Sequence, residues 1–347
     1  MDTKRLETIA DKTRPEDAAK LAAAVAAAGA AAAAGKVGWD RLRQNGREHA
    51  FRIEEGEKLP EGIRGVLAGQ VDKAASHLEG REGEPPDEAV HQARKCFKRS
   101  RATIRLAREE LGEDAFAREN ERYRDLGRKL SGVRDADVLI ATLDGIASRS
   151  GREGAFAGLR ELLVADRDEK RARLLHSEEA RADALERLGS AREAIGELPL
   201  DVQEPKELIA GFRRTYRDGR RAARQAGQTH STEALHEWRK RVKDLWHQCQ
   251  VLEQFWPKRM QSMAEQAHDL SDLLGEDHDL AVLAETAEQQ AQSLTPDERR
   301  ILDRGVRKRR KTLQKAADEV GAKLYAERPR RLADRLEKRA RAALASS

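Results

Sequence analysis

The feature that most constrains this chain is an internal repeat of basic, helix-like sequence. The stretch VHQARKCFKRSRATIRL (residues 90–106) returns as LHEWRKRVKDLWHQCQVL (residues 235–252) after a shift of 145 positions. A second pair follows at an offset of 144, with LSGVRDADVL (residues 130–139) matching LGEDHDLAVL (residues 274–283). This period is much longer than that of a solenoid repeat, so it predicts two similar halves, each of about domain size.

Each copy of the repeat places its basic residues on one face when it is wound as an α-helix, in which successive residues advance by about 100°. Those residues are His91, Arg94, Lys95, Lys98, Arg101 and Arg105 in the first copy, and His236, Arg239, Lys240, Lys243 and His247 in the second. Asp87 and Thr232 are expected to cap the two helices. A single basic face is usually only a solvated surface, whereas two faces in register predict a specific anion site.

The composition favours an all-α fold, because Ala, Leu, Arg and Glu dominate and all four are strong helix formers. Only 4% of the residues are aromatic, and no stretch shows the alternation of a β-strand. Each half offers about four helices, which predicts two similar four-helix bundles related by internal duplication. We expect residues 51–200 to form the first half, residues 201–347 the second, and residues 1–50 an Ala-rich N-terminal appendage.

The appendage differs in composition from the rest of the chain. Its apolar part, between Lys20 and Lys36, is mostly Ala and is too short and too weakly apolar for a membrane span. No signal-peptide core precedes it. We therefore expect no stable membrane insertion, and a tether that anion binding does not need. Cys96 and Cys249 are interpreted as small core residues, in keeping with a cytoplasmic protein.

The repeated motif resembles a known family. Residues 91–98 and 236–243 both have the pattern H-x-x-R-K-x-x-K, and FRIEEGEKLPEGIRGVL opens the first half. Together with the paired segments GVRDADVL and GEDHDLAVL, they are similar to the CHAD domain, the conserved-histidine α-helical domain. The resemblance covers about residues 51–339. It implies two four-helix bundles related by a pseudo-twofold axis, a basic cavity between them, and binding of inorganic polyphosphate at polyphosphate granules.

The chain departs from the family pattern in two places. Many members carry a triphosphate tunnel domain with the motif E-x-E-x-K, but here Glu55 and Glu57 are followed by Leu59. The usual catalytic partner is thus missing, and we expect no enzyme activity, no catalytic residue, no metal and no cofactor. In addition, the second half has Asp277 and His278 where the first has Val133 and Arg134. The two walls of the site are therefore expected to differ in charge.

The sequence therefore predicts a non-enzymatic polyphosphate-binding protein of the cytoplasm, associated with polyphosphate granules. Arg, Lys and His side chains supply the donors that a line of phosphates requires. Besides the basic faces of the two repeat helices, the expected binding residues are Arg124, Arg128, Arg134, Arg213, Arg217, Arg220 and Arg307. Histidines among so many cations should have lowered pKa values, because like charges disfavour the protonated ring.

Other functions remain open as alternatives, chiefly nucleic-acid binding or a scaffold built on the same basic helices. Single-strand binders add aromatic stacking platforms, but Phe97 and Trp238 lie on the apolar arcs, so nucleic acid is expected at most as a weak partner. The pairs His268–Asp269 and His278–Asp279 suggest a metal-dependent phosphohydrolase, but Arg134 replaces the second histidine in the first half. The sequence does not fix the oligomeric state or the preferred chain length.

Overall fold

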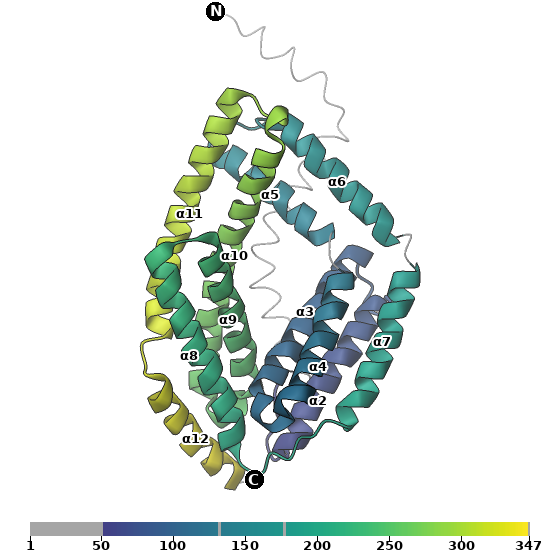
Figure 1. Cartoon of the computed structure of the whole chain (residues 1–347), viewed down its shortest axis with the longest axis vertical. Coiled ribbons are helices and arrows are strands. Elements are labelled where there is room, and N and C mark those ends of the chain that lie inside the picture. The colour runs from purple at the N-terminus through teal and green to yellow at the C-terminus, as the bar shows by residue number, and fades with distance from the viewer. Residues whose placement is uncertain (1–50, 131–132, 176–177, 346–347) are drawn as a thin grey trace, which may run out of the picture. The chain divides into compact units, whose positions relative to one another are not determined.

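Proline starts many of the helices, since the first turn of a helix has no use for the N–H that proline lacks. The computed structural model describes residues 51–130, 133–175 and 178–345, and these residues contain helices but no strand (Figure 1). The helices are α2 (Leu59–Leu78), α3 (Pro86–Leu106), α4 (Arg108–Lys129), α5 (Val133–Arg149), α6 (Ala157–Leu175), α7 (Glu178–Gly196), α8 (Pro205–Thr229), α9 (Thr232–Val251), η3 (Glu253–Phe255), α10 (Pro257–Gln289), η4 (Ala291–Ser293), α11 (Pro296–Leu324) and α12 (Pro329–Ala345). The prediction of an all-α fold is confirmed. The Ala-rich appendage, and every prediction made for it, lies outside the described residues.

Both expected helix caps are wrong by one or two positions. The proline pair before Asp87 already begins α3, so Asp87 lies inside the first turn and instead binds Arg171 of α6 at 2.8 Å. Ser231 rather than Thr232 caps α9, because its hydroxyl oxygen accepts the backbone N–H of Ala234 at 3.2 Å. Serine is a somewhat better cap than threonine, so Ser231 was the stronger candidate of the two neighbours.

Corresponding sequences in the two halves form different numbers of helices. In the first half, α4 ends at Lys129 and α5 starts at Val133, whereas in the second half the 33-residue helix α10 runs without a break. Gly112 also interrupts α4 with a backbone conformation of positive φ (φ 71°, ψ 166°), which glycine adopts without strain. The first half therefore has two helices where the second half has one.

The helix packing follows parallel lines in the two halves. In the first half α2 packs on α3 and α7, α3 on α4, and α5 on α6. In the second half α8 packs on α9 and α12, α9 on α10, and α10 on α11. Across the halves, α3 packs on α9 and α5 packs on α10 (Figure 1). Residues 49–347 thus form a single unit.

The hydrophobic cores do not follow the boundary between the halves. One core takes residues from α2, α3, α4 and α7 together with α8, α9 and α12, and includes Phe97, Tyr216 and Trp238. The other joins α5 and α6 to the C-terminal part of α10 and the N-terminal part of α11, and includes Leu143 and Leu283. Each core is therefore completed by both halves, which keeps the repeat helices in fixed positions.

Candidate functional site

The two repeat helices, α3 and α9, are joined by polar contacts as well as by packing. The side-chain amide of Gln248 donates to the backbone oxygen of Ala102 at 3.0 Å, and both groups are buried. Arg105 on α3 donates to Asp244 on α9 at 3.1 Å. These bonds fix the basic faces of the two helices relative to each other.

Four cations from the two helices form a central cation cluster, which we define as Arg94, Lys98, Arg239 and Lys243. These charges lie near enough to act on one another: after burial, Arg94 and then Arg239 lower the pKa of Lys98. Arg239 and Lys98 in turn lower the pKa of Lys243. The Nε atom of Arg239 is buried and has no hydrogen-bond partner among the described residues. Equivalent positions of the two repeat copies thus lie close enough to affect one another's charge.

The two lysines of this cluster carry the clearest electrostatic signature. Burial, followed by Arg94 and Arg239, lowers the pKa of Lys98 to about 8, although its side chain still reaches solvent. Burial is also the largest cause of the low pKa of Lys243, which lies well below the ordinary value. The protein therefore holds these ammonium groups where their charge is disfavoured, and a bound anion would relieve that cost.

Three histidines near the repeat helices, His236, His247 and His278, have lowered pKa values, and burial contributes more to each shift than the neighbouring charges do. The rings of His236 and His278 lie 4.5 Å apart at an interplanar angle of 37°. Burial and then His236 lower the pKa of His278 to about 4, and the pKa of His236 is lowered for similar reasons. His247 is buried, stacks on Trp246 at 4.8 Å and has a pKa well below its usual value, mainly through burial.

Carboxylates border the central cation cluster, and the sequence reasoning missed them. Asp135 of α5 approaches Arg94 at 3.9 Å and is largely exposed. Burial raises the pKa of Asp279 on α10, while Arg239 and Lys243 act in the opposite direction. The offset of 144 places Asp135 on Asp279, so the repeat itself held the signal that could have found this pair.

Two of the expected phosphate ligands on α3 are engaged with other groups. Arg101 donates to the side-chain oxygen of Asn120 at 3.1 Å, and Arg105 donates to both Asn120 and Asp244 at 3.1 Å. Burial, and then Arg105, lowers the pKa of Arg101 to about 10. Arg241 also approaches Asp244, at 3.4 Å. This end of the basic face therefore works as an ion-pair network between α3, α4 and α9.

The remaining expected ligands are more scattered. Three of them pair with carboxylates of their own helices at 2.8 to 3.1 Å, namely Arg124, Arg217 and Lys240. Others are exposed or half-buried without joining the central cluster through a described ion pair: His91, Arg128, Arg213, Arg220 and Arg307. The side chain of Arg134 lies outside the described residues. Their part in phosphate binding stays a prediction.

Lys95 belongs to a second group of cations on the side of α3 that faces α2. Burial and then Arg99 lower the pKa of Lys95. The guanidinium of Arg99 lies 4.4 Å from the centre of the Phe51 ring, and the ammonium of Lys73 lies 5.2 Å from it. Arg99 also contributes to the low pKa of His247, which connects this group to the repeat helix α9. These contacts could not be predicted from the helical pattern, because they join residues from different parts of the chain.

The described part of the chain offers little for other chemistries. No group of three or more His, Cys, Asp or Glu residues there is arranged to hold a metal ion. None of the helices in the described part of the chain is long and apolar enough to cross a membrane. What the arrangement can do is hold a chain of anions by electrostatic attraction and hydrogen bonds.

Comparison with known families decides which family this geometry represents. The model of the CHAD domain matches residues 65–288, which is more than half of the chain. The chain belongs to the CHAD family. The match includes both repeat helices and the central cation cluster of this CHAD protein. It is shorter at both ends than the expected range of 51–339, so α11 and α12 lie beyond it.

Two relatives come from strains of Mycobacterium tuberculosis. They are the uncharacterized proteins MT2285 and Rv2226, each 31% identical to this chain over 226 residues. The alignments cover 59% of this chain and 40% of each relative. The CHAD protein described here therefore spans less than half the length of the curated relatives that it matches.

Proposed function

We propose that this CHAD protein binds inorganic polyphosphate through the central cation cluster and catalyses no reaction. The observation that carries the proposal is the meeting of four cations from α3 and α9, with the pKa of Lys98 lowered to about 8. A polyanion at this position would offset the repulsion between them. Polyphosphate binding is a general property attributed to the CHAD family, and it fits this charge arrangement.

Each residue type contributes differently to holding a phosphate chain. Arg94 and Arg239 can donate two parallel hydrogen bonds to phosphate oxygens, while Lys98 acts as a point charge. Neutral His236 can still donate one hydrogen bond from its ring. The other predicted ligands on α4, α8 and α11 would extend the surface along a longer chain. We propose that this binding takes the protein to polyphosphate granules.

We further infer that the site was built by internal duplication of a helical bundle. The packing of α2 on α3 and α7 parallels that of α8 on α9 and α12, and the motif histidines occupy corresponding helices. In this proposal the basic cavity lies where α3 and α9 meet. Superposing residues 59–106 on residues 205–251 should then bring His91 onto His236, and a poor fit would speak against duplication.

The experiment that tests the function is a titration with polyphosphate and with duplex DNA at matched phosphate concentration. The protein should bind polyphosphate more tightly, because duplex DNA is a wide and stiff rod. The double variant Lys98→Gln/Arg239→Gln should bind polyphosphate about 100-fold more weakly, since each charge-assisted hydrogen bond contributes about 1.5 kcal/mol.

The matched control is Arg304→Gln/Lys308→Gln, which removes the same charge from exposed positions of α11. Its affinity should stay within about twofold of the unmodified protein, because isolated surface charges contribute little. Equal affinities for duplex DNA and polyphosphate would favour a general nucleic-acid binder instead. Equal losses in the two variants would remove the central cation cluster from the site.

A further inference from the structure

The last helix, α12, carries a row of cations that the proposed site does not use. Its buried face contains Leu332, Leu336 and two alanines, and it packs against α8 and η3. On its outer side Arg331, Arg335 and Lys338 follow one another at steps of four and three residues, and Arg328 lies just before the start of the helix. Residues at these steps lie above one another, about one helical turn apart. Arg331, Arg335 and Lys338 therefore form a row along one side of the helix, with Arg328 at its N-terminal end.

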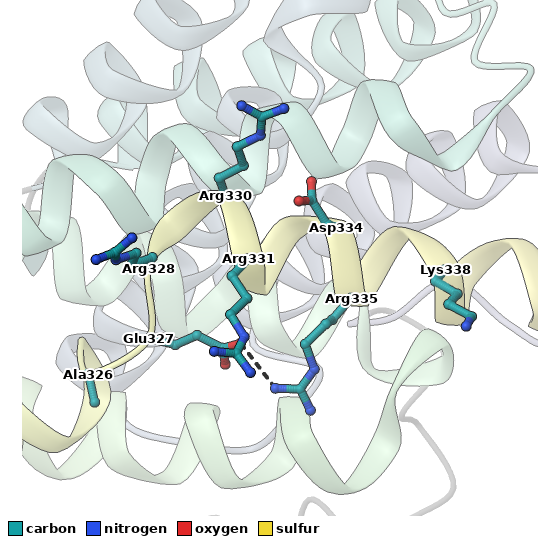
Figure 2. Close-up of a pocket in the computed structure, with 8 residues that line it drawn as sticks. All are labelled: Ala326, Glu327, Arg328, Arg330, Arg331, Asp334, Arg335 and Lys338. Atoms are coloured by element: carbon teal, nitrogen blue, oxygen red, sulfur yellow. Dashed lines mark hydrogen bonds and ion pairs between the residues drawn. The ribbon is translucent and has the colours of Figure 1, made fainter.

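Two adjoining hollows run along this row. The first has a volume of about 890 Å³ and is lined by Ala326, Glu327, Arg328, Arg330, Arg331, Asp334, Arg335 and Lys338 (Figure 2). The second, of about 460 Å³, is lined by Trp256, Arg335, Lys338, Arg339 and Ala342. Because Arg335 and Lys338 belong to both, the hollows form one continuous strip, which we call the α12 strip.

The α12 strip keeps a strong excess of positive charge. Six cations and two carboxylates line it. One of the carboxylates, Glu327, is mostly buried and is shared by Arg335 at 3.0 Å, Arg259 at 3.5 Å and Arg331 at 3.9 Å. The other, Asp334, points to the opposite side of α12 from Glu327 and Arg335, and so does Arg330 (Figure 2). The row is therefore left with more positive charge than its own carboxylates can balance.

The surroundings of the strip favour a phosphate chain over other anionic partners. A single strand of nucleic acid needs an open aromatic face for stacking. The ring of Trp256 packs against the core on one side. On the other side the guanidinium carbon of Arg335 lies 4.7 Å from the centre of the Trp256 ring. A lipid surface would require an exposed apolar face, but the apolar face of α12 is buried. A linear polyanion without bases needs only the row of charges.

We propose that the α12 strip is a second binding surface for inorganic polyphosphate, separate from the central cation cluster. This inference rests on the proposed function. All the cations and carboxylates that line the strip lie beyond residues 65–288, so the family match does not account for its charge; only Trp256 lies within the match. With two surfaces, one protein joins two segments of phosphate chain, and a chain long enough to reach both binds with added avidity.

The test measures how many short polyphosphate chains bind to one protein molecule by titration calorimetry, with chains too short to span both surfaces. The strip variant is Arg328→Gln/Arg331→Gln/Lys338→Gln, which leaves Arg335 in place on Trp256 and Glu327. The control, Arg304→Gln/Lys308→Gln/Lys311→Gln, removes the same charge from an exposed row of similar spacing on α11. We expect two chains for the unmodified protein and the control, and one for the strip variant, with unchanged thermal unfolding.

The outcomes separate this inference from the proposed function. The variant Lys98→Gln/Arg239→Gln should also lose one chain and keep the chain on the α12 strip. If it keeps both while the strip variant loses one, the central cluster is not a site but the inference on α12 stands. Two chains on the strip variant, or a single chain on the unmodified protein, would overturn the inference. So would a strip that binds single-stranded DNA and no polyphosphate.

Discussion

At the scale of single residues, the proposed binding of polyphosphate should depend on pH through Lys98. Its pKa of about 8 in the free protein means that it loses its charge as the pH rises through that value. A bound phosphate chain favours the protonated form and raises the pKa, so binding above about pH 8 takes up a proton. We predict that affinity falls as the pH rises through this range.

The substitution Lys98→Arg provides the check, because arginine stays charged throughout. Titration calorimetry in buffers of different ionisation enthalpy should find less proton uptake for this variant than for the unmodified protein. The remaining uptake would come from Lys243, whose pKa is also lowered. Identical proton uptake in the two proteins would exclude Lys98 from the site.

The residues also mark the limit of reasoning from sequence. The periodicity placed Arg94 and Arg105 on the same face of α3 correctly, but it could not tell their surroundings apart. Arg105 meets a buried carboxylate, Asp244, which belongs to the other half of the chain. A helical pattern fixes which residues share a face, while the groups opposite that face depend on tertiary packing.

At the scale of helices, Gly211 connects the two halves through a close approach of backbones. A Cβ atom at Gly211 of α8 would lie 2.0 Å from the backbone oxygen of Leu106, at the end of α3. That oxygen cannot move aside as a flexible side chain could. We predict that Gly211→Ala lowers the free energy of unfolding by about 2 kcal/mol or more, as overpacking does. Urea unfolding followed by circular dichroism measures the loss.

The control for this prediction is Gly189→Ala in α7, where an added Cβ meets nothing within 4 Å. Because alanine favours helix more than glycine, this variant should be unchanged or more stable by up to about 1 kcal/mol. A loss at both positions would point to a general effect of the substitution. No loss at Gly211 would contradict a tight contact between α8 and α3.

The helices of this protein were easier to predict from its sequence than the hydrophobic cores that the helices form. The repeated basic motif located α3 and α9 from the sequence, and the composition predicted that the rest of the fold is helical. The apolar stripes did not reveal that α5 and α6 complete their core with α10 and α11 of the other half. An amphipathic pattern says that a face is buried, but it does not identify the partner that buries it.

At the scale of the whole molecule, folding and binding are coupled through the contact between α3 and α9. The central cation cluster lies on these two helices, which share one core with most of the others. Folding therefore brings like charges together, which costs stability, and under the proposed function a bound phosphate chain should offset that cost. The free protein should therefore be less stable than its core alone would allow. The protein with bound polyphosphate should be more stable than the free protein.

The substitution Lys98→Gln should make this coupling measurable. Below about pH 8 the folded protein holds Lys98 charged at a cost, and that cost is relieved as the pH rises above the lowered pKa. Near neutral pH, without polyphosphate, the variant should therefore be more stable. The gain should be at most about 1 kcal/mol, since water screens the partly exposed ammonium.

With polyphosphate the order of the two proteins should reverse. Polyphosphate at 100 times its dissociation constant stabilises the unmodified protein by about 2.7 kcal/mol, and it stabilises the more weakly binding variant by less. Thermal unfolding across a range of polyphosphate concentrations should thus give two curves of Tm that cross.

Added salt should reduce the stabilisation by polyphosphate in both proteins, because binding releases counterions. The exposed substitution Lys311→Gln serves as the control, and its curve should follow that of the unmodified protein. Curves that run parallel would mean that Lys98 affects stability without taking part in binding.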